Sequence, residues 1–224
     1  MGGNFPALLV QLQADLPSLI SALGETVLLS VIITINGLIG GLLVFYLTLS
    51  NSGVVRKIIN GYISIFIGTP LIVFLFLLYY GLPTIGIRLS PFVIAVFGFF
   101  LNVSAYNARF LVTAYKGLLP TELEAAKAQG FSRGQIFRLV TAPQVLRLAA
   151  PALASQAIQN TKDSSIVFLI QYTEFFAGMQ EIAMRSFLFF ETYFVTALVY
   201  LLLVSVIVLA MRRLERRFTI PGLS

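Results

Sequence analysis

The 224-residue chain contains no cysteine, no histidine and no tryptophan. Without cysteine it can form neither a disulfide nor a thiol nucleophile, and without histidine it lacks the commonest metal ligand and general base. Catalysis of the cysteine–histidine or zinc type is therefore excluded. The sequence also has no G-x-x-x-x-G-K-S/T loop, the segment that cradles nucleotide phosphates. We therefore expect no catalytic residues, no metal and no cofactor in this chain.

Charged residues are scarce as well. They make up 11% of the chain, against 58% hydrophobic residues, and the mean hydropathy is +0.93. Soluble domains carry about a quarter charged residues, so this composition indicates a membrane protein in contact with the lipid bilayer. No shift in composition divides the chain, which predicts a single transmembrane domain over residues 1–224. The net charge of +6 reflects the bias of basic residues toward cytoplasmic loops, and no nucleic-acid partner is expected.

Five segments are long and apolar enough to cross a bilayer as helices, which predicts an all-α integral membrane fold. They span about 26–50, 62–82, 91–115, 149–171 and 193–211.

Basic residues resist translocation, so their distribution predicts which side each loop occupies. With the C-terminus in the cytoplasm, the outer loops hold only Arg88 and Arg185. The N-terminus then lies outside, where residues 1–24 are expected to form a periplasmic interfacial helix; a disordered leader is the alternative. The cytoplasmic loops and tail hold the remaining loop cations, Arg56, Lys57, Lys116, Lys127, Arg133, Arg138, Arg147, Arg212, Arg213, Arg216 and Arg217.

The longest connection, 117–147, is cytoplasmic in this arrangement and contains helix signals. Thr121 and Glu124 have the spacing of a capping box, which predicts that a first helix starts there. Gly130 can adopt a positive φ at low cost and is expected to end that helix.

A second helix is expected to follow at once. Ser132 is a candidate N-cap for residues 134–140, and Pro143 is expected to stop the helix. Composition alone would also allow a solvated loop that merely joins two spans. The caps favour a helix, a sharp turn and a helix.

The spacing of this segment resembles the EAA motif of ABC-importer permeases. In that family the loop forms a coupling helix that docks on the ATP-hydrolysing subunit. The resemblance therefore implies a role in ATPase coupling for the residues that match the motif, namely Glu124, Ala125, Ala126, Gly130, Phe131, Ser132 and Pro143.

The resemblance extends along the chain. The segments "ETVLLSVIITINGLIGGLLV", "IGTPLIVFLFLLYYGLP", "NVSAYNARFLVTAYKGLLPTELEAAKAQGFSRGQIF" and "PALASQAIQNTKDSSIVFLI" are similar, in this order, to permeases of the polar amino-acid uptake family. The chain differs from the usual pattern at Ile67, Phe74 and Arg109, where that family more often has Arg, Gln and Glu. The implied fold is the five-helix transmembrane domain of a type I ABC importer.

The same resemblance implies a location and several partners. The location is the bacterial cytoplasmic (inner) membrane, and the substrate is an amino acid. The partners are a cytoplasmic dimer of ATP-binding cassette subunits and a periplasmic or surface-anchored solute-binding protein. Because five helices enclose too little space for a path, a second permease, identical or related, is also expected.

The fourth predicted span carries a polar stripe with helical spacing. Its members are Gln156, Gln159, Asn160 and Asp163, with Ser164 next to them. A charge in a transmembrane helix costs at least about 2.5 kcal/mol and so calls for a reason. The stripe either lines a substrate path, in which Asp163 accepts the ammonium of an amino acid, or it joins neighbouring helices.

Two further classes of protein remain open on the residues alone. A self-contained secondary carrier or channel would use Asp163 as an ion or proton site, and it would often show internal repeats, of which none is visible. A membrane anchor or assembly subunit would use the polar stripe only to pack helices.

Overall fold

The computed structural model describes residues 4–218, and this part of the chain is helical, with no β-strand. It divides into two compact units that alternate along the sequence. Unit 1 consists of Met1–Thr34, Leu71–Gly98 and Ala157–Leu209, and unit 2 of Ile35–Pro70, Phe99–Gln156 and Ala210–Ser224. Four long helices, α2, α5, α8 and α10, contribute residues to both units.

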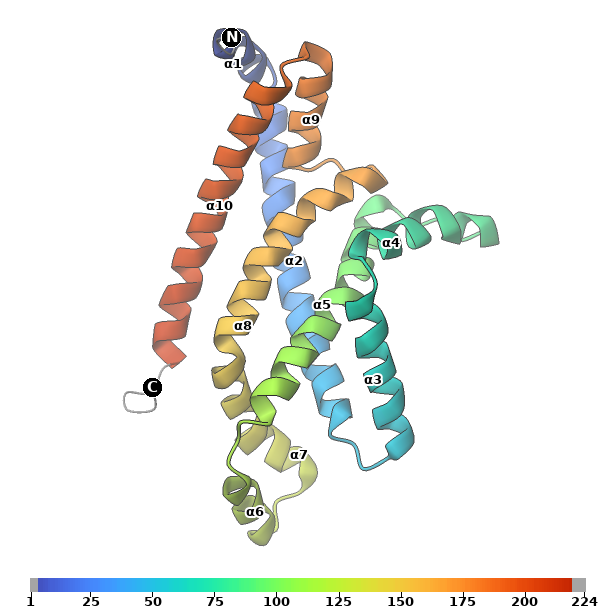
Figure 1. Ribbon diagram of the computed structural model, residues 1–224, viewed down its shortest axis with the longest axis vertical. Helices are drawn as coiled ribbons and strands as arrows, with labels where there is room; N and C mark the ends of the chain where they lie inside the picture. The colour runs from blue at the N-terminus through green and yellow to red at the C-terminus, as the bar shows by residue number, and fades with distance from the viewer. Residues whose placement is uncertain (1–3, 219–224) are drawn as a thin grey trace. The chain divides into compact units, whose positions relative to one another are not determined.

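Unit 1 contains the N-terminal helix and the segment from the end of α8 to most of α10 (Figure 1). Its elements are α1 (Phe5–Ala14), the first part of α2 (Leu16–Thr48), α4 (Leu71–Phe76), η1 (Leu77–Gly81), η2 (Leu82–Ile85), the start of α5 (Pro91–Tyr115), the end of α8 (Ala142–Asp163), η4 (Ser164–Ile170), α9 (Phe175–Ser186) and most of α10 (Phe189–Phe218).

Unit 2 contains the long interhelical connection and the parts of the spans next to it. Its elements are the second part of α2, α3 (Gly53–Gly68), the second part of α5, α6 (Pro120–Ala128), α7 (Arg133–Ile136), η3 (Phe137–Thr141) and the first part of α8.

The structure supports the five predicted spans, with changed boundaries. Four helical stretches, Leu16–Thr48, Pro91–Tyr115, Arg133–Ile170 and Phe189–Met211, are long and apolar enough to cross a membrane. The fifth is α3 together with residues 71–85, if the two pieces form one span. The predicted third span, 91–115, has the bounds of α5. The predicted second span is interrupted at Thr69 and Pro70, because proline cannot continue the hydrogen-bond pattern of α3.

The predicted outer helix is shorter than expected. Helix α1 ends at Ala14, Asp15 caps it, and α2 already begins at Leu16. Pro17 explains the break, because it has no amide to donate into a continuing helix but is tolerated in the first turn of a new one. Residues 1–3 of the predicted segment lie outside the described residues.

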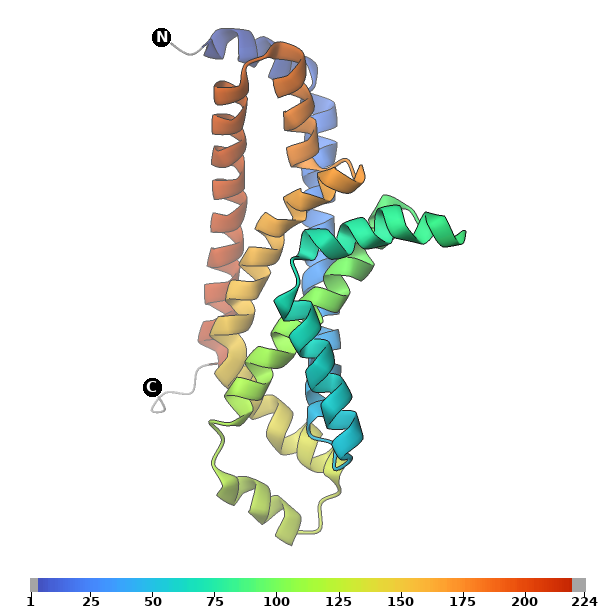
Figure 2. The same cartoon turned by 45° about the vertical axis from the view of Figure 1, so that its right-hand side comes forward.

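Contacts within unit 1 hold α1 against the ends of α9 and α10, beside which it lies in both ribbon views (Figures 1 and 2). The backbone N–H of Asn4 donates to Glu191 Oε1 at 2.6 Å, and Arg185 forms an ion pair with Asp15. Leu8 is only 1% exposed and packs with apolar side chains of α2 and α9. For residues 4–14, the disordered-leader alternative is therefore wrong.

Glycines of α2 allow a close approach to α5 within unit 2. A Cβ added at Gly41 would lie 2.5 Å from the Cβ of Asn107, and one added at Gly40 would lie 2.1 Å from the hydroxyl of Ser104. These distances are too short for any side chain, so α2 and α5 are in backbone-to-side-chain contact here. Below this contact, Phe45, Leu111 and Val145 form a fully buried apolar cluster.

We predict opposite effects for two glycine-to-alanine substitutions. Gly41→Ala forces α2 away from Asn107 and is expected to cost about 1–3 kcal/mol, as overpacking does. Gly61→Ala, in the interior of α3, has no neighbour within 4 Å and is expected to be neutral or stabilising by up to about 1 kcal/mol. Thermal unfolding of the detergent-purified protein, followed by circular dichroism, measures both; equal midpoints for the two variants would contradict the packing described.

Candidate functional site

The connection between α5 and α8 forms a discrete helix–turn–helix within unit 2. Helix α6 runs from Pro120 to Ala128, and α7 follows at Arg133 after a sharp turn, as Figure 2 shows in yellow-green. Gly130 has a φ of 80°, in the left-handed region, so the predicted role of this glycine is confirmed. Its backbone N–H donates to Lys127 O and that of Phe131 donates to Ala126 O, which satisfies carbonyls at the end of α6.

One of the two predicted helix starts is confirmed and the other is wrong. Ser132 caps α7 in a capping box, because its hydroxyl accepts from Gln135 N and its own N–H donates to Gln135 Oε1 at 2.8 Å. Helix α6, in contrast, begins at Pro120 with Leu119 at the N-cap and without a side-chain cap. The fixed φ of proline at the first helical position starts the helix one residue before the predicted Thr121–Glu124 pair can act.

The prediction that Pro143 stops the second helix is also wrong. Helix α7 leads into η3, a π-helical turn, and then directly into α8, in which Pro143 is the second residue. In a regular helix the ring of a proline collides with the carbonyl four residues earlier and its missing N–H leaves a gap. The widened turn of η3 accommodates both defects, so the chain remains helical from Arg133 to Ile170.

The predicted coupling residues differ in exposure. Glu124 and Ala125 of α6 are exposed, and so are Gly130, Phe131 and Ser132 at the turn. Ala126 is only 7% exposed and packs inside unit 2. The segment therefore offers Glu124, Ala125 and the turn to a partner, while Ala126 sets how closely α6 packs against its own chain.

The predicted polar stripe on α8 separates into two faces in unit 1. Gln159 Nε2 donates to Asp163 Oδ1 at 2.7 Å, and this pair lies on the more accessible face, with Gln159 exposed and Asp163 half-buried. Asn160 is 1% exposed and donates to Thr34 Oγ1 of α2 at 3.2 Å. The hydroxyl of Ser164 is buried and donates to Thr161 O.

This division assigns different tasks to neighbouring residues. The carboxylate of Asp163 and the amide of Gln159 are accessible for a polar ligand. Asn160 and Ser164 are used in contacts within the chain, which agrees with the packing alternative for these two residues. Gln156, the first residue of the stripe, is half-buried and belongs to unit 2.

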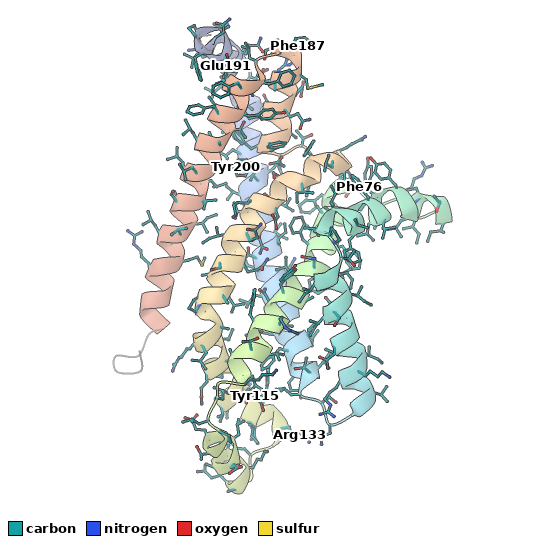
Figure 3. All side chains as sticks on the ribbon, in the orientation of Figure 1. Phe76, Tyr115, Arg133, Phe187, Glu191 and Tyr200 are labelled. Carbon is teal, nitrogen blue, oxygen red and sulfur yellow. The ribbon has the colours of Figure 1, made fainter. Side chains whose placement is uncertain are left out.

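A buried carboxylate that the sequence did not single out lies between the fourth and fifth predicted spans. Glu174 is fully buried and caps the N-terminus of α9, where its Oε1 accepts from Ala177 N and its Oε2 from Phe176 N, both at 2.9 Å. Oε2 also accepts from the hydroxyls of Thr26 in α2, at 3.1 Å, and Tyr200 in α10, at 2.9 Å. Figure 3 labels Tyr200 on α10.

Glu174 therefore joins three helices of unit 1 through one side chain. Burial raises the pKa of the Glu174 carboxyl, and the bonds from Phe176, Ala177, Tyr200 and Thr26 act in the opposite direction. The only signal in the sequence is an acidic residue directly before an apolar helix. That signal is weak, because Ser, Thr, Asp and Asn are the usual N-caps.

Within residues 4–218, the structure has no group of three or more His, Cys, Asp or Glu side chains that could hold a metal ion. The polar groups of the site described above are amides, hydroxyls and single carboxylates, all of which can form hydrogen bonds.

Comparison with known proteins gives consistent matches over nearly the whole chain. Residues 37–220 match the family described as binding-protein-dependent transport system inner membrane component. The chain is 33% identical over 202 residues to the probable amino-acid ABC transporter permease protein YckA of Bacillus subtilis, covering 90% of this chain and 89% of YckA. It is 31% identical over 207 residues to the glutamine transport system permease protein GlnP of Escherichia coli, covering 92% and 94%.

Solved structures show the same fold. The crystal structure of an amino acid ABC transporter with histidines matches with a TM-score of 0.85 at 27% identity, over 97% of this chain and all of that chain. An inward-facing structure of the MetNI methionine ABC transporter matches with a TM-score of 0.71 over 90% of this chain, and at 18% identity it bears on the fold alone.

We predict that Glu174→Ala is strongly destabilising. It leaves two backbone N–H groups and two hydroxyls without their acceptor, and we expect the free energy of unfolding to fall by about 3 kcal/mol. Glu181→Ala is the matched control on the same helix, because the Glu181 side chain is 70% exposed and makes only a 3.9 Å contact with Arg185. Thermal unfolding of both variants tests this. If the unfolding midpoint falls by the same amount in both variants, relative to the wild type, the role assigned to Glu174 is wrong.

Proposed function

Since this chain belongs to the family of binding-protein-dependent transport system inner membrane components, we propose that it forms half of the translocation path of an importer for polar amino acids. As a member of that family it is a multi-pass inner-membrane permease with the type I importer fold, and ATP is hydrolysed by a partner subunit. It is a transport subunit rather than an enzyme.

The observation that carries the proposal is the extent of the match. Relatives that align over about nine-tenths of their length are amino-acid permeases of ABC transporters, and their names include a glutamine permease, GlnP, and an L-cystine permease, TcyB of Bacillus subtilis. Because these substrates differ, they support a class of substrate rather than one amino acid. The same match favours the importer over a self-contained carrier or channel.

The ATPase subunit docks, in our proposal, on the helix–turn–helix within residues 117–147. Support comes from the exposure of Glu124 and Ala125 and from the defined turn at Gly130. Phe131 is 36% exposed beside this turn and offers an aromatic anchor for a groove. Ser132 and Pro143 act indirectly, because they set the start of α7 and the join to α8.

Coupling in this arrangement is mechanical. ATP draws two ATPase subunits together, the docked helices follow, and the permease changes between inward-open and outward-open states. A second permease, identical or related, supplies the other half of the path, and a solute-binding protein delivers the substrate from outside. The N-terminus lies outside and the C-terminus in the cytoplasm, as the distribution of basic residues predicts.

The substrate path contains the polar face of α8, with Gln156, Gln159 and Asp163 as its proposed lining. The Asp163 carboxylate accepts the substrate ammonium, and the bond from Gln159 holds that carboxylate in place. Asn160 and Ser164 border the path and support it through the bonds to Thr34 and Thr161.

We predict that Gly130→Val weakens ATPase binding. A β-branched residue at a φ of 80° is strained by about 1–3 kcal/mol, so the turn between α6 and α7 changes shape. Co-purification of the ATPase subunit with the tagged permease measures the loss. Gly134→Val is the matched control, because Gly134 lies in the same segment with open space around it and without a positive φ. Unchanged ATPase binding and uptake in Gly130→Val would refute the docking assignment.

We predict that Asp163→Asn lowers uptake while the complex still assembles. Loss of a charged acceptor for the ammonium is expected to reduce uptake about tenfold or more. Uptake of radiolabelled amino acids into proteoliposomes measures it, with subunit stoichiometry determined on the same samples. Glu181→Gln, an exposed carboxylate of the same unit, is expected to transport normally. Normal uptake by Asp163→Asn would remove this residue from the path.

A further inference from the structure

Unit 2 contains a cavity beside the proposed docking segment, for which no ligand has been proposed so far. It measures about 320 Å³ and lies where the end of α2 meets the end of α5 and the segment from α6 to η3. Figure 3 labels two of its lining residues, Tyr115 and Arg133. The other lining residues are Tyr46, Leu47, Leu49, Ser50, Asn51, Leu123, Lys127, Ile136, Phe137 and Thr141.

The charged residues that line the cavity are all basic. Lys127 and Arg133 are its only charged residues, and no carboxylate lines it. Among the described side chains, ion pairs are formed by Arg185 with Asp15 and Glu181, so neither Lys127 nor Arg133 has a carboxylate partner. Two cations that face one cavity repel each other, and an anion bound between them removes this repulsion.

The rest of the lining indicates which anion fits. Hydroxyl groups of Tyr115, Ser50 and Thr141 can donate hydrogen bonds, and the arginine fork matches the oxygens of a phosphate group. Apolar side chains of Leu49 and Phe137 form part of the wall, which a small hydrated anion does not need. A phosphate attached to an apolar body uses both parts of the lining.

The position of the cavity indicates that the apolar part of the ligand belongs to a membrane lipid. Helices α2 and α5 both end at its wall, at Thr48 and Tyr115, and both are candidate membrane spans. The cavity therefore lies at the level where lipid headgroups begin, and the proposed orientation puts it on the cytoplasmic side. Basic pockets between transmembrane helices on that side are suited to anionic headgroups.

We propose that this cavity binds the phosphate group of an anionic phospholipid from the cytoplasmic leaflet. The inference rests on the proposed function for the orientation of the chain. Lys127 belongs to α6 and Arg133 to α7, on opposite sides of the turn at Gly130. A phosphate held by both braces this turn against Ser50 and Asn51 at the end of α2. The lipid thereby stiffens the segment on which the ATPase docks, and coupling depends on it.

The test compares two double substitutions that remove the same charge. Lys127→Gln/Arg133→Gln removes both cations of the cavity. Arg56→Gln/Lys57→Gln is the matched control, because these exposed residues of α3 lie in the same unit and do not line the cavity. The charge-preserving variant Lys127→Arg/Arg133→Lys separates loss of charge from damage to the fold.

Each variant is purified with its ATPase subunit from membranes that contain phosphatidylglycerol, and the retained phospholipid is determined by native mass spectrometry. We expect the control and the charge-preserving variant to retain phosphatidylglycerol as the wild type does. The cavity variant is expected to retain about tenfold less, because it lacks both phosphate-facing cations. Equal retention by the cavity variant and the control would overturn the proposal.

A second measurement connects binding to coupling. Stimulation of ATP hydrolysis by the solute-binding protein is compared in nanodiscs of phosphatidylcholine alone and with added phosphatidylglycerol. We expect phosphatidylglycerol to increase stimulation for the wild type and the control but not for the cavity variant. If inorganic phosphate replaces phosphatidylglycerol in this assay, the ligand is a soluble anion and the lipid proposal is wrong.

ATPase docking and lipid binding can be tested separately. If wild-type permease binds no ATPase in any lipid, the proposed function is wrong. If the complex assembles and transports, but the cavity variant responds to phosphatidylglycerol as the control does, only the lipid site is wrong.

Discussion

The hydrocarbon core of a membrane offers no hydrogen-bond partner, so every polar group that enters it needs a partner within the protein or along an aqueous path. In this chain the requirement explains why helices dominate and why polar side chains occur in linked sets. Within the spans, Asn160 of α8 bonds to Thr34 of α2. Between the fourth and fifth spans, the buried Glu174 accepts bonds from two amides and two hydroxyls. Gln159 and Asp163 bond each other on a more accessible face, which is the face proposed for the substrate.

The same requirement separates structural from transport roles. A buried group whose bonds are all made within the chain stabilises helix packing and has no capacity left for a solute, as with Glu174. A carboxylate that keeps one accessible side can bind a second partner, as with Asp163. In unit 2, close packing at Gly40 and Gly41 holds α2 against α5. Much of the helix–turn–helix in the same unit is exposed and can contact a partner. In the proposed mechanism, movement of this segment is transmitted to the spans.

Some patterns local in the sequence were predicted correctly, whereas the cap at Thr121 and the helix end at Pro143 were not. The bounds of 91–115 follow from hydropathy, the turn at Gly130 from the freedom of glycine, and the cap at Ser132 from the preference of serine for the N-cap position. Contacts between distant residues were not predictable, since Glu174 meets Thr26 across 148 residues and its role depends on the fold. The stripe on α8 was read as one face, but the adjacent residues Gln159 and Asn160 point about 100° apart on a helix. Asn160 therefore bonds to α2, while Gln159 bonds to Asp163, four residues further on. The roles of the coupling and path residues themselves stay predictions.

The π-helical turn of η3 has a consequence for the setting of α8. Such a turn holds about one residue more than an α turn, so its conversion to ordinary α geometry would rotate the following helix by about 100° around its axis and advance it by about 1.5 Å. Pro143 opposes this conversion, because an ordinary turn needs the amide that proline lacks. The proline therefore fixes the rotational position of α8, although it was expected only to end the preceding helix, 134–140.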